Sequence, residues 1–362
     1  MRLISLACLT LVSFALQAQD LLGDLRNQGI GFAQVVPGKT LQFPRDHGAH
    51  PDYRIEWWYL TANLTDRQGR DWGLQWTLFR QSLSPEQLHG GWQSNQIWMA
   101  HAAITTPEGH FHEERFARGD IGQAGVTRIG RDGYFNAWMD DWQWLSSGAA
   151  LLPARLDFNV GEREISLTLE AGGELVKNGI DGYSQKSAQG QASYYYSQPH
   201  IQVRGFIRQG SDKTLLNGKG WLDREWSSQA LADNQQGWDW FSLHLDDGHK
   251  LMVYQLRHDD GKHWLSGNWI DPQGHSTLLD ADRIDLKSLR RRKISTGDNQ
   301  SRELPLEWQL DLGEQNRRWR IRPLYDQQWM ATQFPYWEGV VLVEDEQGTR
   351  SGIGYMELTG YH

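Results

Sequence analysis

The chain has 362 residues, 39% of them hydrophobic, and a formal net charge of −9 at pH 7. This acidic balance argues against nucleic acids and anionic membrane surfaces as partners. Cys8 is the only cysteine, which excludes an internal disulfide and a thiolate metal site, and we expect no metal and no other cofactor.

The first 18 residues have the pattern of a secretory signal peptide. Arg2 gives a short positive start, residues 3–16 form an apolar run, and the segment 15–18 supplies small residues, Ala15 and Ala18, for cleavage. We therefore expect cleavage near Gln19 and a periplasmic or secreted protein with no transmembrane anchor after cleavage. A buried N-terminal helix is the alternative. Because Cys8 lies inside the apolar run and not at its end, a lipid-modified cysteine is not expected.

Hydrophobic and polar residues alternate over most of the remaining chain. Leu156, Phe158 and Val160 follow this period of two, and short pairs such as Asp132-Gly133 and Gly172-Gly173 separate the runs. Strands at this spacing, joined by tight turns, predict an all-β fold built as a sandwich or a barrel.

The chain also repeats itself in outline. The stretch 57–64, Trp-Trp-Tyr-Leu-Thr-Ala-Asn-Leu, resembles 238–245, and the stretch 218–223 resembles 352–357. Landmarks matched in the same order predict two copies of one β unit. Chance similarity between aromatic strands is the alternative.

A polar stretch at 227–236 is the expected boundary between the two copies. We therefore predict an N-terminal domain at 19–228 and a C-terminal domain at 235–362, following the signal peptide at 1–18. About 340 residues are ample for two medium cores.

Tryptophan is unusually frequent. Its 19 residues outnumber both the 12 tyrosines and the 11 phenylalanines. So many indoles exceed what a core normally needs, and they suit the walls of an apolar cavity or a surface that binds sugars or lipids.

Several catalytic motifs are absent from the sequence, namely the Gly-x-Ser-x-Gly elbow, His-Glu-x-x-His, the P-loop and the dinucleotide fingerprint. His110 and His112, followed by Glu113 and Glu114, are compatible with a metal site on one strand face. An exposed strand end explains the same pattern better.

Two aromatic clusters allow both structural and functional interpretations. Glu56 stands at the head of Trp57-Trp58-Tyr59, either as a structural acceptor for indole or arginine groups or at the mouth of a cavity, and we favour the structural role. Ser184 and Lys186 share one strand face just before the segment 193–197, so a Ser–Lys nucleophile is conceivable. A sequence pair alone does not establish that geometry.

A third cluster, Trp221-Leu222-Asp223-Arg224-Glu225-Trp226, places Trp221, Asp223 and Glu225 on one face of a strand. Burial and a neighbouring carboxylate both raise the pKa of a carboxyl, and such a group is suited to act as a general acid near neutral pH. A structural bridge from Asp223 or Glu225 to an arginine is an equally good interpretation.

Together these clusters resemble the AttH/CrtC family of secreted hydrolase-like proteins and carotenoid 1,2-hydratases, which are grouped with the calycins. The segments that carry the resemblance span nearly all of the predicted mature chain: Glu56–Tyr59, Phe79-Arg80, His101–Ala103, Gly182–Lys186, Ser193–Ser197, Trp221–Trp226, Trp238–Trp240 and Gly354–Tyr361. The resemblance implies two lipocalin-like antiparallel β-barrel domains in tandem.

For function, the resemblance implies water addition to an isoprenoid double bond, with Asp223 in the place of the acid and Tyr194 and Tyr196 beside it. The sequence departs from the hydratase pattern, because Trp-Leu-Asp-Arg-Glu replaces Tyr-His-Asp-His-Asn. Arg224, directly after the acid, is expected to favour the ionised form of Asp223.

We therefore expect an apolar lipid or isoprenoid inside a lipocalin-type barrel, held by a hydratase or hydrolase. A non-catalytic periplasmic lipid carrier or chaperone is the main alternative, and a carbohydrate-binding module is a third. The predicted catalytic residues are Asp223, Glu225, Tyr194, Tyr196 and Trp221. The predicted ligand-binding residues are Glu56, Trp57, Trp58, Tyr59, His101, Tyr183, Ser184, Lys186, Tyr195, Trp226, Trp238, Asp239 and Trp240.

Overall fold

A computed structural model describes residues 25–26, 29–86, 90–127, 133–297 and 300–361. Among these residues, no helix is long and apolar enough to cross a membrane. The predicted signal peptide, with Cys8 and the expected cleavage point at Gln19, lies outside the described residues.

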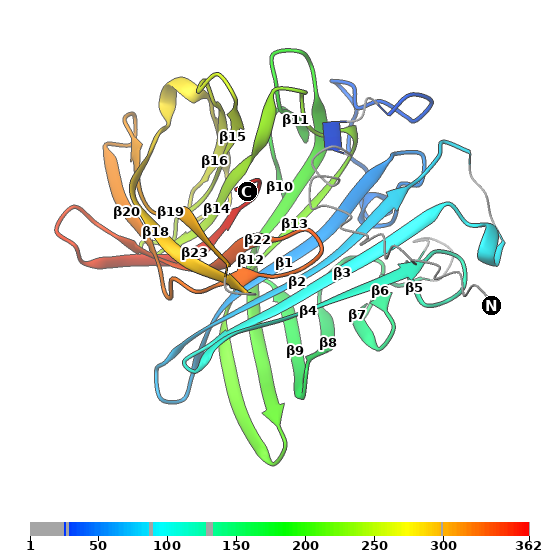
Figure 1. The fold of residues 1–362 in the computed structure, drawn as a ribbon, viewed down its shortest axis with the longest axis horizontal. Coiled ribbons are helices and arrows are strands. Elements are labelled where there is room, and N and C mark those ends of the chain that lie inside the picture. Colours follow the sequence, from blue (N-terminus) through cyan, green and yellow to red (C-terminus); the bar gives the residue numbers. More distant parts are fainter. Residues whose placement is uncertain (1–24, 27–28, 87–89, 128–132, 298–299, 362) are drawn as a thin grey trace, which may run out of the picture.

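The fold is all-β, as predicted, and consists of two large antiparallel sheets (Figure 1). The first sheet has the strand order β4-β3-β2-β1-β13-β12-β9-β8-β7-β6-β5, with β10 and β11 pairing to β12. Its strands are β1 (Ile55–Asp66), β2 (Asp71–Ser82), β3 (Gln96–Thr106), β4 (Gly109–Arg118), β5 (Ala124–Val126), β6 (Asn136–Met139), β7 (Trp142–Ser146), β8 (Ala154–Val160), β9 (Arg163–Ala171), β10 (Val176–Lys177), β11 (Tyr183–Gln185), β12 (Ala192–Gln209) and β13 (Asp212–Gln229).

The second sheet has the order β17-β16-β15-β14-β23-β22-β20-β19-β18, with β21 pairing to β22. Its strands are β14 (Gln235–Leu245), β15 (Lys250–His258), β16 (Trp264–Ile270), β17 (Ser276–Leu279), β18 (Asp285–Gly297), β19 (Gln300–Leu312), β20 (Arg317–Pro323), β21 (Trp329–Met330), β22 (Tyr336–Glu344) and β23 (Arg350–Leu358). Within the described ranges, three short 3-10 helices lie in connecting segments: η1 (Arg45–His47), η2 (Gly91–Gln93) and η3 (Ala281–Arg283).

The chain passes from the first sheet to the second between Gln229 and Gln235. In each half, the strand that begins the aromatic repeat pairs with the strand that ends it, so β1 lies beside β13 and β14 beside β23. The division into two domains that fold separately stays a prediction.

The first sheet curls into a nearly closed barrel, because β4 at one end contacts β6 and β8 near the other. Alternation along β1 sends Trp58 and Leu60 into this barrel, where they join Trp76, Trp142 and Trp144. The indoles therefore mainly fill the core of the barrel, and of the 19 tryptophans only Trp57, Trp238 and Trp240 line the cavity described below. The expectation that the tryptophan surplus forms cavity walls is wrong for most of these residues.

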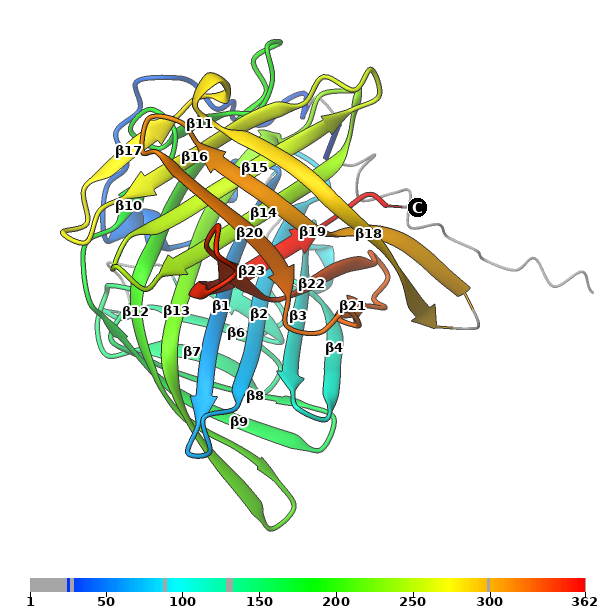
Figure 2. The ribbon, with the colours of Figure 1, turned by 90° about the vertical axis from the view of Figure 1, so that its left-hand side faces the viewer.

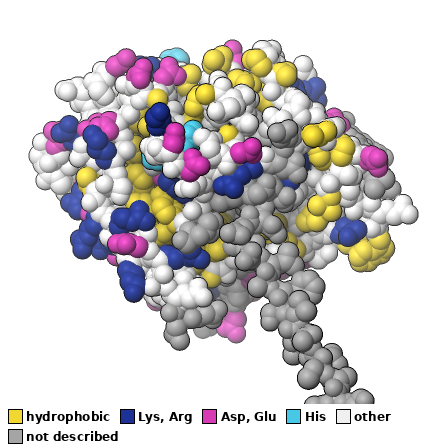
Figure 3. Space-filling view, turned by 45° about the horizontal axis from the view of Figure 1, so that its top comes forward, with side chains coloured by type: hydrophobic (Ala, Val, Ile, Leu, Met, Phe, Trp, Pro, Cys, Tyr) yellow, Lys and Arg dark blue, Asp and Glu magenta, His cyan; other side chains and the backbone are white. Residues whose placement is uncertain are grey.

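The second sheet lies across β1, β2 and β3 of the first (Figure 2). Side chains on the outer face of the first sheet meet side chains of the second sheet there. They form a separate apolar cluster that includes Tyr59, Trp221, Trp240 and Tyr355. A hydrogen bond from Asn63 Nδ2 to the Gly354 carbonyl, 2.9 Å long, also joins the sheets. On one outer face of the molecule, side chains of both charges are interspersed with hydrophobic ones (Figure 3).

Glu56 is fully buried inside the barrel and forms ion pairs with Arg80 and Arg224. Burial alone raises the pKa of Glu56, but the two guanidinium groups and His50 hold this pKa well below its usual range. This carboxylate therefore accepts hydrogen bonds from two arginines and binds β1 to β2 and β13, and Glu56 also borders the cavity described below.

We predict that Glu56→Gln lowers the free energy of unfolding by about 3 kcal/mol or more, because it leaves two buried guanidinium charges without a counter-charge. Urea denaturation measures this change. Glu170→Gln, at the exposed pair with Arg204, is the matched control and is expected to cost less than about 1 kcal/mol. Equal losses of unfolding free energy in the two variants would contradict a structural role for the ion pairs of Glu56 with Arg80 and Arg224.

Candidate functional site

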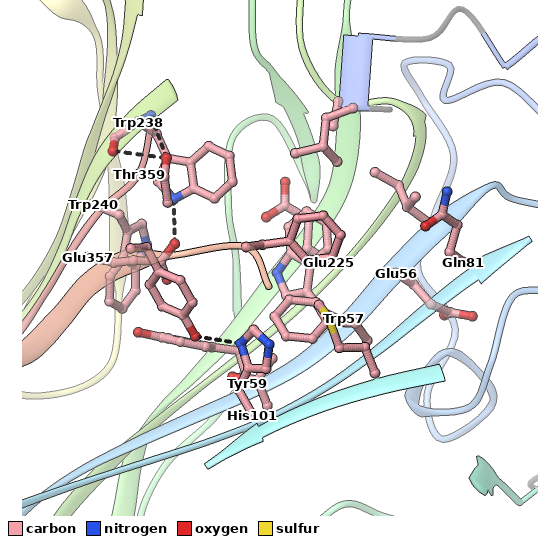
Figure 4. Close-up of a pocket in the computed structure, with 18 of the residues that line it drawn as sticks. Glu56, Trp57, Tyr59, Gln81, His101, Glu225, Trp238, Trp240, Glu357 and Thr359 are labelled. Atoms are coloured by element: carbon pink, nitrogen blue, oxygen red, sulfur yellow. Dashed lines mark hydrogen bonds between the residues drawn. The ribbon is translucent and has the colours of Figure 1, made fainter. Parts of the chain in front are cut away.

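A cavity of about 430 Å³ lies between the two sheets. Residues of β1, β2, β3, β12 and β13 form one wall, and residues of β14, β15 and β23 form the other. Figure 4 shows Trp57, His101 and Glu225 on one side and Trp238 and Glu357 on the other. This cavity lies between the two sheets, whereas side chains fill the interior of the first barrel. The expectation of a bound apolar ligand stays a prediction.

Asp223 and Glu225 enter the cavity because they occupy alternate positions on β13, as the sequence predicts. They stand opposite Tyr59 and Trp57 on β1. The intervening residue, Arg224, points into the barrel, where it pairs with Glu56. Arg224 thus does not neutralise Asp223, contrary to the expectation drawn from its position in the sequence.

Asp223 is 3% exposed and accepts three hydrogen bonds. Tyr195 donates its hydroxyl to Oδ2 at 2.7 Å, Trp221 donates its indole N–H to Oδ1 at 2.8 Å, and the Ser197 hydroxyl also donates to Oδ1. Burial raises the pKa of Asp223 to about 7, although the three hydrogen bonds oppose this shift, and the nearby carboxyl of Glu225 raises it further. A substantial fraction of Asp223 is therefore protonated at neutral pH.

Glu225 is paired with Lys186, whose Nζ lies 2.9 Å from Oε1. Burial alone lowers the pKa of Lys186, but the Glu225 carboxylate outweighs this effect, so the pKa of Lys186 is raised and the ammonium group stays charged. Its Nζ lies 4.9 Å from the ring centre of Tyr195 and 4.3 Å from that of Tyr254.

This ion pair argues against the Ser–Lys nucleophile. Ser184 Oγ lies 3.1 Å from the Tyr254 hydroxyl and is not among the cavity-lining residues. A charged lysine that is held by Glu225 has no lone pair with which to take a proton from a serine.

The opposite wall repeats this arrangement with Glu357 on β23. Trp238 donates its indole N–H to Glu357 Oε1 at 2.7 Å. Burial raises the pKa of Glu357 to about 7, against the effect of the Trp238 hydrogen bond, and the carboxyls of Asp223 and Glu225 add to the rise. Two carboxyls with raised pKa values thus line one cavity from different sheets.

Glu338, the partner of Glu357 on β22, lies behind the cavity and is fully buried. Tyr59 donates its hydroxyl to Glu338. Burial and the neighbouring Glu357 raise the pKa of Glu338 well above its usual range. Its surroundings therefore favour the neutral form of the Glu338 carboxyl.

His101 joins the two sheets at the floor of the site. Its Nδ1 lies 2.9 Å from the Tyr336 hydroxyl and its Nε2 lies 3.0 Å from Glu114 Oε1. Both ring nitrogens are thus engaged, and the ring forms one cavity wall beside Phe79.

The predicted residues divide into two groups. Ten line the cavity: Glu56, Trp57, Tyr59, His101, Lys186, Tyr195, Asp223, Glu225, Trp238 and Trp240. Eight do not: Trp58, Tyr183, Ser184, Tyr194, Tyr196, Trp221, Trp226 and Asp239. Trp221 nevertheless contacts Asp223 through its hydrogen bond.

Tyr194 and Tyr196, which the resemblance places beside Asp223, lie on the opposite face of β12. Tyr194 donates its hydroxyl to the Val36 carbonyl at 3.0 Å, and the Tyr196 hydroxyl lies 2.8 Å from His47 Nδ1. Tyr195 faces the acid instead. Three consecutive tyrosines satisfy an alternating pattern in either register, which explains why the sequence does not select between them.

Trp58, Trp226 and Asp239 also point away from the cavity. The two indoles belong to the core of the first barrel. Asp239 is fully buried, pairs with Arg257 and accepts a hydrogen bond from Gln255. It repeats the structural arrangement of a carboxylate beside an arginine that Glu56 has in the first sheet.

Glu357 is the main functional candidate that the sequence prediction omitted. The match of 218–223 with 352–357 aligns it with Asp223, so the signal was present in the repeat. Tyr254, Leu256 and Tyr336 were also omitted, and they come from strands whose sequence carries no distinguishing motif.

Among the described residues, no group of three or more His, Cys, Asp or Glu side chains is arranged to hold a metal ion. His112 Nε2 accepts a hydrogen bond from the Ala331 amide at 3.1 Å, and His110 Nε2 lies 3.4 Å from the sulfur of Met330. These two imidazoles are therefore engaged with the segment that contains β21.

Comparison with known proteins identifies a family and several similar solved structures, two of which follow. The AttH-like family model matches residues 34–361. A structure from Nitrosomonas europaea described as an AttH has a TM-score of 0.79 and 34% sequence identity, covering 91% of this chain and all of that one. Kievitone hydratase from Nectria haematococca has a TM-score of 0.66 and 12% identity, covering 91% of this chain and 96% of that one. No significant match was found among curated proteins.

The raised pKa of Asp223 predicts a pH effect on stability. An unfolded aspartate ionises near pH 4, whereas folded Asp223 ionises near pH 7. Its contribution to stability is therefore fully present below about pH 4 and is lost as the pH rises to about 7. In Asp223→Asn, stability should fall less steeply with pH over this window, by up to about 1.4 kcal/mol per pH unit. Urea denaturation across the window tests this, and parallel curves for the two proteins would refute it.

Proposed function

Since the chain belongs to the AttH-like family, we propose that it is a hydratase that adds water to a carbon–carbon double bond of an apolar lipid or isoprenoid, with Asp223 as the general acid. The observation that carries this proposal is the environment of Asp223. It is a desolvated carboxyl with a pKa of about 7 that borders an apolar cavity.

The cavity suits an apolar ligand of modest size. Its volume of about 430 Å³ falls in the range of small-molecule sites. Aliphatic and aromatic side chains, among them Ile55, Phe79, Met99 and Leu256, form most of its walls. Burial of apolar ligand surface against them supplies binding energy, while the few polar groups fix the orientation of the ligand.

The chemistry requires a neutral acid and a site that tolerates positive charge. Asp223 gives its proton to the less substituted carbon of the double bond, which leaves a cation on the other carbon. Trp57, Tyr59 and Trp240 line the cavity, and the faces of aromatic rings attract such a cation. Water then forms the C–O bond and releases a proton.

The likeness to kievitone hydratase supports this proposal at the level of the fold, since that enzyme is named as a hydratase and shares the overall architecture. At 12% identity it does not indicate the same substrate. We further propose that the protein is exported, on the basis of the signal-like pattern at residues 1–18.

A lipid carrier is the competing function, because the apolar cavity alone would serve it. A carrier has no use for a carboxyl whose pKa is raised by burial, since an apolar wall would bind the ligand better. The structure brings two such carboxyls, Asp223 and Glu357, to the cavity, and this favours catalysis.

We expect the wild-type protein to hydrate alkenes that end in a dimethylallyl group, and kievitone belongs in the panel of test compounds. Asp223→Asn should lower turnover by roughly 10²- to 10⁴-fold, because the amide cannot deliver an acidic proton. Mass spectrometry of products formed in ¹⁸O-labelled water measures the hydration. Asp157→Asn, at a surface pair with Arg155, is the matched control.

Binding must be measured alongside turnover. Quenching of tryptophan fluorescence reports ligand entry, because Trp57, Trp238 and Trp240 line the cavity. We expect Asp223→Asn to bind the alkene with an affinity close to that of wild type. Binding without turnover by the wild-type protein across the whole panel would instead favour the carrier function.

A further inference from the structure

We propose that Glu357 is a second catalytic group, the general base that takes the proton from the attacking water. This inference rests on the proposed hydratase function and extends it to the second sheet. It implies that the site is complete only when both halves of the repeat are present.

The repeat places Glu357 and Asp223 at equivalent positions. Asp223 stands opposite Tyr59 in the pairing of β13 with β1, and Glu357 stands opposite Trp240 in the pairing of β23 with β14. Tyr59 and Trp240 are themselves equivalent in the sequence repeat. Their rings meet edge to face across the cavity wall with centres 5.3 Å apart. The two carboxyls therefore approach one cavity from opposite sheets.

The two carboxyls differ in the way they are held. Asp223 is 3% exposed and its two oxygens accept hydrogen bonds from Tyr195, Ser197 and Trp221. Glu357 is only partly buried, and the structure describes one hydrogen bond to it, from Trp238 to Oε1. Glu357 thus has spare acceptor capacity toward the cavity, which is what a base needs in order to bind the nucleophilic water.

The charges around the pair favour a single shared ionisation. Lys186 is committed to Glu225, so it does not neutralise either Asp223 or Glu357. A charge on Asp223 raises the pKa of Glu357, so the two carboxyls do not readily ionise together. One protonated and one ionised carboxyl are the two forms that an acid and a base require at the same pH.

The proton of Asp223 forms a C–H bond at the less substituted alkene carbon, and the π electrons supply that bond, leaving a cation on the neighbouring carbon. Water attacks the cation, and its second proton passes to the Glu357 carboxylate. Proton transfer from Glu357 to Asp223 through solvent restores the starting state. The sum is alkene plus water to alcohol, without an oxidant or reductant.

The test compares wild type, Glu357→Gln and Asp223→Asn in D₂O with kievitone and the other dimethylallyl alkenes as probes. In Glu357→Gln the cation still forms, but water capture slows, so Asp223 takes back a proton and regenerates the alkene. We expect alcohol formation to fall by at least about 10²-fold, while deuterium continues to enter the vinyl position of the recovered alkene. Asp223→Asn should lose both processes. Glu344→Gln, at a pair with Arg322 on the same sheet, is the control.

Glu357→Asp provides a second variant that keeps the carboxylate, and we expect it to recover part of the hydration that Glu357→Gln loses. The inference fails if Glu357→Gln hydrates at the wild-type rate, or if it loses deuterium exchange together with hydration. Equal losses in Glu357→Asp and Glu357→Gln would also overturn it. If the wild-type protein neither hydrates nor exchanges any probe, the proposed function itself fails, and that result is distinct from the others.

Discussion

The site depends on carboxyl groups that are desolvated between two packed sheets without enough positive charge to balance them. Asp223, Glu225, Glu338 and Glu357 all lie at this junction, and Lys186 pairs with only one of them. Ionising the others would place uncompensated charge in an apolar region, which is costly. The neutral form is therefore stabilised, and an ordinary side chain becomes an acid that works near pH 7.

The alternation of a β-strand separates this chemistry from the structural charges. On one face of β13, Arg224 joins Glu56 inside the barrel, where the ion pair keeps the carboxylate ionised. On the other face, Asp223 accepts hydrogen bonds from Tyr195, Ser197 and Trp221, and burial raises its pKa. The carboxyls of Glu56 and Asp223 thus have pKa values shifted in opposite directions, because the two faces of one sheet meet different neighbours.

Much of this arrangement could be predicted from the sequence. The period of two predicts both the all-β fold and the shared face of Asp223 and Glu225. The repeat aligns the strands that carry Asp223 and Glu357. These features depend on local geometry, which neighbouring residues in the chain determine.

Other features depend on contacts that local patterns do not encode. The pairing of Lys186 with Glu225 joins residues far apart in the chain. The choice of Tyr195 over Tyr194 and Tyr196 depends on strand register, which three identical residues leave open. The position of the cavity depends on how the second sheet packs against the first, and tryptophan content alone does not distinguish a filled barrel from a cavity wall.

Infrared spectroscopy of the wild-type protein and Asp223→Asn near pH 6, below the pKa of about 7, tests the central claim most directly. We expect a protonated-carboxyl band in the wild type that shifts in D₂O and loses intensity in the variant, whereas an unchanged band would show that Asp223 is ionised and would contradict the account.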